Sequence, residues 1–270
     1  MCGIFGYTGK GNASFVIHQG LKRLEYRGYD SWGISLIKNG KIKCVKDVGH
    51  IPESIAIGKV DGNIGIGHTR WATHGGVTIT NAHPHFSSYK SFVIAQNGIV
   101  ENYTSLKSKL ESKGFKFNTQ VDTEAIVKLV EYELKESNDI KKALVTAFKQ
   151  LEGRNTVILL DSRSKRILAI RNGSPLVMGI NNENIYLASD PLAFSQYTKE
   201  IVDIDNGELV EIQNGKWNIY SIKTGKEIIK VSRKEIFSNS DIDKGKYEHF
   251  MLTEIVEQQH TILTATGYTL

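Results

Sequence analysis

Hydrophobic residues recur along the chain in short runs that predict β-strands. Such runs, bounded by Gly, Asn or Asp, predict strands at residues 4–8, 62–68, 92–96, 156–161, 166–171 and 185–188. Two more pairs of runs flank Asn-Gly dipeptides, which favour tight hairpin turns because both central residues take positive φ. These pairs are residues 34–38 and 41–45, and residues 208–213 and 216–220.

Apolar residues at helical spacing predict helices in four regions. These regions are residues 15–24, 103–110, 125–134 and 140–151. The last two are separated by Ser137, Asn138 and Asp139, which are favourable N-cap residues. Strands come first, then helices, then many strands. This order indicates an α+β protein in which helices cover antiparallel sheets, rather than a βαβ alternation.

The pattern changes after Tyr220. We expect a domain over residues 1–222 and a polar linker over residues 223–246. A new helical pattern then begins within residues 247–270, with Phe250, Ile255 and Val256. We expect this segment to be the start of a further domain or a helix that binds a partner.

Composition excludes several classes of protein. The 40% hydrophobic and 9% aromatic content is too high for a disordered chain, and no apolar run approaches the length of a membrane span. The net charge of +5 comes from basic residues mixed with acidic ones, so we expect no nucleic-acid partner. Two cysteines give no disulfide framework, and the N-terminus lacks signal-peptide features. We therefore expect a cytoplasmic protein with no membrane association.

Cys2 is the strongest candidate for catalysis. If Met1 is removed, the Cys2 thiol and a free α-amine share one residue, and the amine can take the thiol proton directly or through water. By position alone, a buried structural cysteine is the more common interpretation. The motifs further along the chain reverse that preference. Cys44 lies within a predicted hairpin strand and is interpreted as a core residue.

Polar and aromatic residues follow the predicted strand that ends near residue 68. The guanidinium of Arg70 suits a carboxylate, Thr73 and His74 offer further polar groups, and Trp71 can form a wall or gate. His83 belongs to a cluster of histidines whose spacing raises the question of zinc. No Cys, Asp or Glu stands at ligand spacing beside the cluster, so we expect no metal and no cofactor. For each histidine a hydrogen-bonded structural role is the alternative.

Two further motifs have both a structural and a catalytic interpretation. Asn97 and Gly98 end a predicted strand and could form only a turn, or they could supply an amide and a backbone N–H to an oxyanion hole. Asp122 precedes a predicted helix and could be its N-cap, or its carboxylate could hold a substrate ammonium.

Taken in order, eight motifs closely resemble the glutaminase domain of the glutamine–fructose-6-phosphate aminotransferase family, from residue 1 to about residue 270. The motifs are residues 2–6, 26–31, 68–75, 81–85, 97–98, 122–124, 173–176 and 188–190. The resemblance implies a class II amidotransferase with the fold of N-terminal nucleophile hydrolases, a four-layer α-β-β-α sandwich of antiparallel sheets. It also implies that L-glutamine is hydrolysed to glutamate and ammonia, and that the full-length protein is a homo-oligomer.

The resemblance assigns a role to each candidate residue. It makes Cys2 the nucleophile, with Asn97 and Gly98 as the oxyanion hole. It makes Trp71 a gate for ammonia. The substrate-binding residues that it implies are Arg27, Arg70, Thr73, His74, His83 and Asp122.

Two features depart from the family pattern. Gln96 stands where the family usually has His, and glutamine can donate and accept hydrogen bonds but cannot titrate. The sugar-phosphate isomerase modules are absent from the sequence, so fructose 6-phosphate would be reached only through an absent or separate synthase domain. The alternatives are a stand-alone glutaminase that serves another acceptor, as in purine-pathway amidotransferases, or a regulatory subunit that binds glutamine.

Overall fold

The computed structural model describes residues 1–54, 62–237, 247 and 250–266 of the chain. The chain divides into two compact units, Met1–Ile236 and Phe237–Leu270. The first unit holds both sheets and every candidate site residue, and the described part of the second consists mainly of one helix, α5 (Phe250–Ala265). Among the described residues, no helix has the length and apolar character needed to cross a membrane.

One sheet of the first unit has eight strands, in the order β15-β11-β9-β10-β1-β4-β2-β3. All of its strand pairs are antiparallel. β1 lies in the interior of this sheet, between β10 and β4. The strands are β1 (Gly3–Thr8), β2 (Ser31–Lys38), β3 (Lys41–Val48), β4 (Ile64–Arg70), β9 (Val177–Ile180), β10 (Ile185–Ala188), β11 (Glu200–Asp203) and β15 (Arg233–Lys234).

The other sheet has seven strands, in the order β14-β13-β12-β8-β7-β6-β5, again antiparallel throughout. The strands are β5 (His85–Phe86), β6 (Phe92–Gly98), β7 (Asn155–Asp161), β8 (Arg166–Asn172), β12 (Glu208–Gln213), β13 (Lys216–Ser221) and β14 (Glu227–Ile228).

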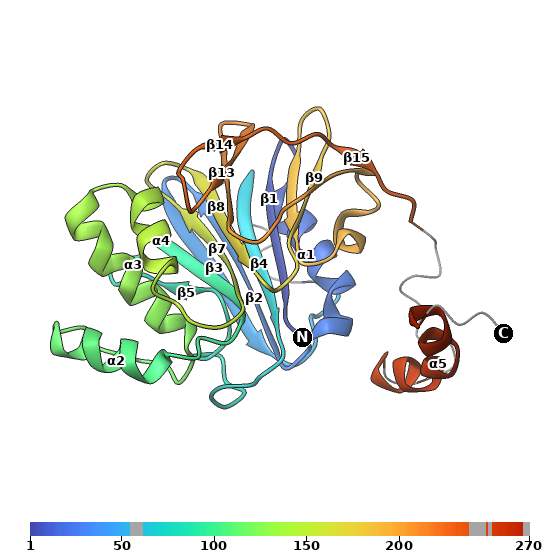
Figure 1. The fold of residues 1–270 in the computed structure, drawn as a ribbon, viewed down its shortest axis with the longest axis horizontal. Coiled ribbons are helices and arrows are strands. Elements are labelled where there is room, and N and C mark those ends of the chain that lie inside the picture. Colours follow the sequence, from blue (N-terminus) through green and yellow to red (C-terminus); the bar gives the residue numbers. More distant parts are fainter. Residues whose placement is uncertain (55–61, 238–246, 248–249, 267–270) are drawn as a thin grey trace. The chain divides into compact units, whose positions relative to one another are not determined.

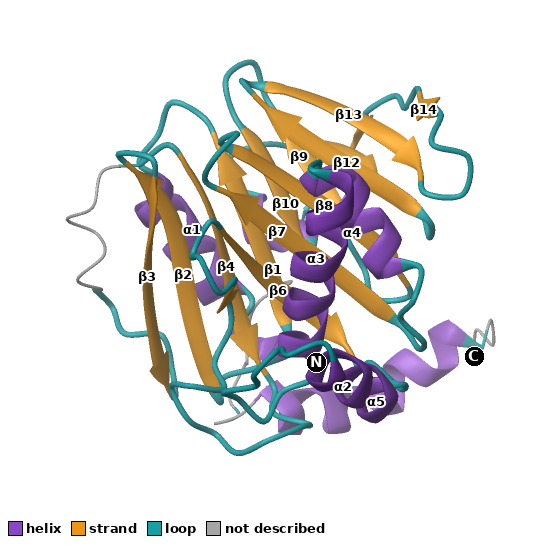
Figure 2. Ribbon diagram, turned by 90° about the vertical axis from the view of Figure 1, so that its left-hand side faces the viewer, coloured by secondary structure: helices purple, strands orange, loops and turns teal. Residues whose placement is uncertain are grey.

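Helices cover the outer face of each sheet, so the first unit has four layers (Figure 1). The helix α1 (Ala13–Arg23) and the short 3-10 segments η1 (Glu25–Arg27) and η3 (Pro191–Phe194) pack on the eight-stranded sheet. The helices α2 (Tyr103–Ser112), α3 (Thr123–Ser137) and α4 (Ile140–Phe148) pack on the seven-stranded sheet, as Figure 2 also shows. A third apolar cluster fills the space between the sheets. The predicted α-β-β-α sandwich is therefore confirmed.

Side-chain alternation explains how one strand serves two layers. In β6, Phe92 and Ile94 pack toward the helices, whereas Val93 and Ala95 join the cluster between the sheets. Both faces of the strand are thus buried. The same alternation sends Gln96 toward α3 and Asn97 toward the other sheet. This difference in direction decides which of the two can reach β1.

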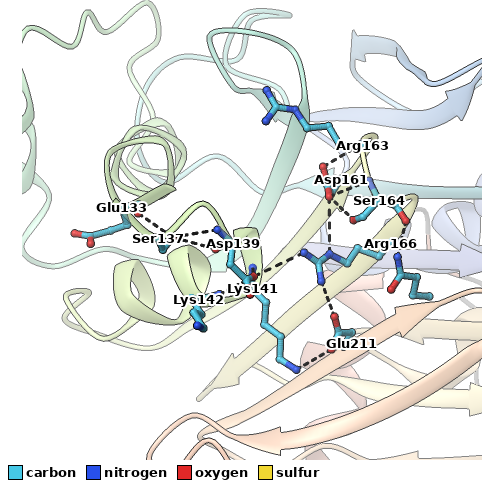
Figure 3. A network of polar contacts seen from close by, with 11 residues as sticks. Glu133, Ser137, Asp139, Lys141, Lys142, Asp161, Arg163, Ser164, Arg166 and Glu211 are labelled. Carbon is cyan, nitrogen blue, oxygen red and sulfur yellow. Dashed lines mark hydrogen bonds and ion pairs between the residues drawn. The ribbon is translucent and has the colours of Figure 1, made fainter. Parts of the chain in front are cut away.

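A polar network joins the turn between α3 and α4 to the seven-stranded sheet (Figure 3). Asp139 caps α4 by accepting hydrogen bonds from the backbone N–H groups of Lys141 and Lys142, as predicted from the Ser-Asn-Asp cluster. Glu211 on β12 pairs with Arg166 and with Lys141, each at 2.7 Å. This network ties the start of α4, next to the C-terminal end of α3, to the sheet.

The predicted elements agree with the structure apart from their ends and a few short strands. β4 begins at Ile64 rather than at residue 62, and β9 and β11 were not predicted. Residues 223–246 were expected to form a linker. However, β14 pairs with β13 and β15 pairs with β11, so the compact unit extends to Ile236. Residues 238–246 of the expected linker lie outside the described residues.

Candidate active site

Four strand ends bring the candidate catalytic residues together. Ile4 and Ile66 belong to the cluster between the sheets, so Cys2, two positions before Ile4, and His68, two after Ile66, face the same layer. Asn97 comes to this layer from the opposite sheet. The site therefore forms at the edge of the space between the sheets, where β1 begins and where β4, β6 and β10 end.

The Cys2 thiol is enclosed by the backbone of Trp71. Its Sγ accepts a hydrogen bond from the Trp71 N–H at 3.2 Å and donates to the Trp71 carbonyl at 3.5 Å. Burial raises the pKa of the thiol. The Trp71 hydrogen bond and the positive charges of the chain N-terminus and Arg70 act in the opposite direction. The thiol therefore needs a nearby base to become a thiolate near neutral pH.

Arg27 holds the backbone of Cys2. Its Nε donates to the Cys2 carbonyl at 3.2 Å, and the Asn97 amide donates to the same oxygen at 3.1 Å. Arg27 is itself fixed by Asp190, whose Oδ2 lies 3.7 Å from Nη1 and accepts a hydrogen bond from the Tyr26 hydroxyl at 2.6 Å. Arg27 is thus a buried residue, only 7% exposed, that contacts the main chain of Cys2.

His68 fixes the orientation of the Asn97 side chain. Its Nε2 lies 3.1 Å from Asn97 Oδ1 and 3.0 Å from the Gln96 carbonyl, so it donates to two oxygens that can only accept. Burial lowers the pKa of His68 to about 3, which keeps the ring neutral. With Oδ1 held by His68, the Asn97 amide nitrogen points to Cys2 O and to Ser189 Oγ, the latter at 2.8 Å.

Gly98 occupies a position that other residues cannot take. Its φ is +124°, and a Cβ placed there would lie 1.9 Å from the carbonyl oxygen of Arg154. The chain can therefore turn beside Cys2 at this point only with glycine, which leaves the peptide of Gly98 exposed to the cavity next to the thiol.

Two cavities meet at Cys2. One, of about 190 Å³, is lined by Met1, Cys2, Arg27, Trp71, Thr73, Asn97, Gly98, Ile99, Ser174 and Pro175. The other, of about 20 Å³, has room for roughly one water molecule. Its lining residues are Cys2, Arg70, Trp71, Thr73, His74, His83, Gln96, Gly98, Val121 and Asp122. Every site residue expected from the sequence lines at least one of these cavities.

The smaller cavity has a cation and an anion in its wall. The Arg70 guanidinium donates to the backbone carbonyls of His74, Gly75 and Gly76, the last at 3.1 Å, and so holds the loop after β4. Burial raises the pKa of Asp122. Asp122 stands at the N-cap position of α3 but makes no capping hydrogen bond; its Oδ2 accepts from the Val100 N–H at 2.8 Å. The interpretation of its side chain as an N-cap is thus wrong.

His83 and Gln96 belong to a buried hydrogen-bonded chain. The Thr123 hydroxyl donates to Gln96 Oε1 at 2.7 Å and lies 2.6 Å from His83 Nε2, so His83 donates to it. Gln96 Nε2 donates to Asn155 at 2.7 Å. Burial holds the pKa of His83 well below its usual range. Gln96 therefore has both ends of its amide occupied without any need to titrate.

Two supporting residues were not assigned a role from the sequence. Ser189 accepts from the Ile4 N–H and from Asn97, each at 2.8 Å, and so joins β10, β1 and β6. Asp30 accepts from the Ala72 N–H at 2.8 Å and anchors the loop that contains Trp71. Both residues lie inside motifs of the sequence analysis, at residues 26–31 and 188–190. Their place in these motifs was the only feature of the sequence that pointed to them.

Comparisons with known proteins define the class of this chain. A family model described as a glutamine amidotransferase domain matches residues 68–196. Among solved structures, glutamine phosphoribosylpyrophosphate amidotransferase from B. subtilis aligns with a TM-score of 0.72 and 26% identity, over 83% of this chain and 50% of that one. The fold is that of the N-terminal nucleophile hydrolases, and the chain belongs to the class II glutamine amidotransferase family.

Curated relatives indicate which type of glutamine amidotransferase this chain resembles. The chain is 41% identical to glutamine–fructose-6-phosphate aminotransferase (isomerizing) of Bacteroides thetaiotaomicron, over 97% of this chain and 44% of that protein. It is 42% identical to the enzyme of the same name from Pyrococcus horikoshii, over 98% and 45%. The chain thus spans less than half the length of these relatives and corresponds to their glutaminase domain. The resemblance inferred from the eight motifs is confirmed.

Proposed function

We propose that this chain hydrolyses L-glutamine to L-glutamate and ammonia through a γ-glutamyl thioester on Cys2. The observation that carries the proposal is the meeting of a buried thiol, the oriented Asn97 amide and Gly98 around one cavity wall. A thiol and two hydrogen-bond donors are the components that an acyl-transfer site requires.

The chemistry follows from these groups. After removal of Met1, the free α-amine of Cys2 takes the thiol proton, and Sγ attacks the side-chain amide carbon of glutamine. The Gly98 N–H donates to the oxyanion, and Asn97 Nδ2 joins it by turning one of its two hydrogens away from its present acceptor, the Cys2 carbonyl or Ser189 Oγ. The ammonium of Cys2 then returns its proton to the leaving nitrogen, and ammonia departs. Water, deprotonated by the same amine, attacks the thioester, and the thiol and glutamate are released.

Glutamine carries an α-carboxylate and an α-ammonium, which call for one cation and one anion a short distance apart. Arg70 and Asp122 line the same small cavity and supply this pair, with Thr73, His74 and His83 completing its wall. Burial raises the pKa of Asp122, although the Val100 hydrogen bond and the charge of His74 act in the opposite direction. A substrate ammonium would add a cation and favour the charged form.

The acceptor of the ammonia is proposed from the relatives. Their name implies fructose 6-phosphate as the acceptor, reached through a synthase part that the matched region does not include. Trp71 lines both cavities beside Cys2 and packs edge-on to Tyr29, with ring centroids 5.8 Å apart. It is thus placed to gate the passage of ammonia away from the thioester.

Intact mass tests the nucleophile directly. We expect the purified protein to have lost Met1 and to gain one adduct from a glutamine-like electrophile, located on Cys2 by peptide mapping. Addition of L-glutamine should slow the labelling. Retention of Met1, or a processed chain that stays unlabelled, would contradict the mechanism and favour a regulatory subunit that only binds glutamine.

Replacement of Arg70 by alanine is expected to lower kcat/KM for glutamine by roughly 100-fold, chiefly through KM, because a charge-assisted contact to the substrate carboxylate is lost. Arg70→Lys is the matched variant, because it keeps the charge but not the planar guanidinium. Its kcat/KM should lie between that of the unchanged protein and that of Arg70→Ala. Steady-state glutamate release measures both. A loss confined to kcat, with KM unchanged, would argue against carboxylate binding by Arg70.

A further inference from the structure

A third cavity lies between α3 and the loops around β5, apart from the two cavities of the candidate active site. Its volume is about 950 Å³, near the upper end of the roughly 300–1,000 Å³ typical of small-molecule sites. None of its lining residues lines either cavity beside Cys2. Nothing in the proposed glutaminase reaction uses this space.

The charged lining of this cavity is mainly basic. Its two acidic residues are already bonded within the protein. Glu124 accepts hydrogen bonds from the backbone N–H groups of Asn118 and Thr119, and Glu131 accepts from the Ser88 N–H and hydroxyl. Five basic residues line the same space: Lys46, Lys116, Lys128, Lys135 and Arg163. The guanidinium of Arg163 points away from the Arg166 network (Figure 3). An anion would complement this excess of positive charge.

Two of these cations are buried, Lys128 in an ion pair with Glu131 and Lys46 without a paired carboxylate among the described residues. Lys128 is 5% exposed, and its Nζ lies 2.9 Å from Ser88 Oγ and 3.3 Å from Glu131 Oε2. Lys46 Nζ donates to the Ala82 carbonyl, a neutral acceptor, at 2.6 Å. Burial lowers the pKa of Lys46. A buried ammonium without a full counter-charge is unfavourable, so this wall is suited to a bound anion.

His85 adds a hydrogen-bond acceptor to the same wall. It is 4% exposed, and among the described residues its Nε2 has no hydrogen-bond partner. Burial and the nearby positive charges hold the pKa of His85 well below its usual range, so the ring is neutral. The ring donates to the Asn81 backbone carbonyl through its other nitrogen, which leaves Nε2 with a free lone pair. A ligand with a hydroxyl group would satisfy this atom.

Aromatic rings supply the apolar part of the lining. Phe86 and Phe115 both line the cavity, and Lys135 Nζ lies 4.9 Å from the centroid of the Phe115 ring. The apolar C–H surface of a ligand can pack on such rings. We propose that this cavity binds a small hydroxylated anion, such as a sugar phosphate or a sugar acid, whose anionic group contacts Lys46 and Lys128 and whose hydroxyl donates to His85 Nε2.

Calorimetric titration with matched probes tests the proposal. Glucose 6-phosphate and gluconate carry both an anion and hydroxyl groups, whereas glucose and inorganic phosphate each carry one of the two. We expect one-to-one binding of glucose 6-phosphate or gluconate at least tenfold tighter than either partial probe. The better of the two identifies the anionic group. Binding should persist after Cys2 is blocked by a glutamine-like electrophile, which separates this result from that of the proposed glutaminase function.

Variants locate the site. Lys46→Met removes the buried charge and His85→Phe removes the acceptor, and each is expected to weaken binding at least tenfold. Lys135→Gln, at an exposed lining position, should weaken it severalfold without a change in Tm, so the test does not depend on buried variants. Lys142→Gln, exposed on α4 outside the cavity, is the matched control. Equal binding of all four probes, loss of binding on blocking Cys2, or wild-type binding by all three cavity variants would overturn the proposal.

Discussion

Replacement of Cys2 by alanine is expected to abolish glutamine hydrolysis, with kcat reduced by about 10⁶-fold, the scale seen when a catalytic nucleophile is removed. The thioester cannot form without Sγ, although the residues that line the smaller cavity remain. Glutamine should therefore still bind to the variant. The measurement is glutamate release over hours, together with a glutamine titration followed by calorimetry.

Cys2→Ser is the informative companion to this variant. It retains a hydroxyl next to the same α-amine, but a hydroxyl is a much weaker nucleophile at neutral pH than a thiol beside a base. We expect a trace of activity above that of Cys2→Ala. Near-normal turnover by Cys2→Ala would exclude a thioester on Cys2. Cys44→Ser should leave the rate unchanged because Cys44 lies on β3, outside both cavities at the active site.

Acidification is expected to destabilise the folded chain steeply below pH 6.5. Burial lowers the pKa of His68 to about 3, and the pKa values of His83 and His85 are also well below the usual range. Below the unfolded value of about 6.5, the unfolded chain binds three protons that the folded chain excludes. The contribution of the three histidines to the free energy of unfolding is therefore fully present above pH 6.5 and is lost as the pH falls toward 3. The loss is up to ~4 kcal/mol per pH unit, because each of the three groups contributes about 1.4 kcal/mol per pH unit.

The raised pKa of Asp122 works in the opposite direction, because the folded chain then binds a proton more readily than the unfolded chain. One carboxyl does not offset three histidines. Urea unfolding at pH 7.5, 6.5 and 5.5 measures the slope. His85→Gln should reduce this slope by about one third. A stability that is flat over this interval would show that the histidines accept protons in the folded state.

The secondary structure was predictable where periodicity was long. Strands of six to eight residues such as β1, β2 and β7 were visible as apolar runs, and the Asn-Gly turns placed two hairpins. β9 and β11, of four residues each, were missed, although β10 of the same length was predicted. Their existence depends on neighbours in the sheet more than on their own sequence.

The motifs were enough to predict which residues form the active site. They did not predict the hydrogen bonds between those residues. The Ile4 N–H bonds to a serine 185 positions away, and Asn97 reaches the same serine across 92 positions. No local pattern encodes such pairings. The role of His68 was likewise hidden, because it arises from strand alternation that aims its ring from one sheet at an amide in the other.

The place of β1 within its sheet also sets when the nucleophile can exist. β1 is the first strand of the chain, yet it pairs on one side with β4 and on the other with β10. Cys2 is therefore synthesised well before Ser189, and its surroundings are complete only after Ser189 has been synthesised and β10 has docked. Such distant pairing forms late in folding. A nascent or partly folded chain thus carries an ordinary thiol, and the proposed capacity to hydrolyse glutamine would arise only when the sandwich closes.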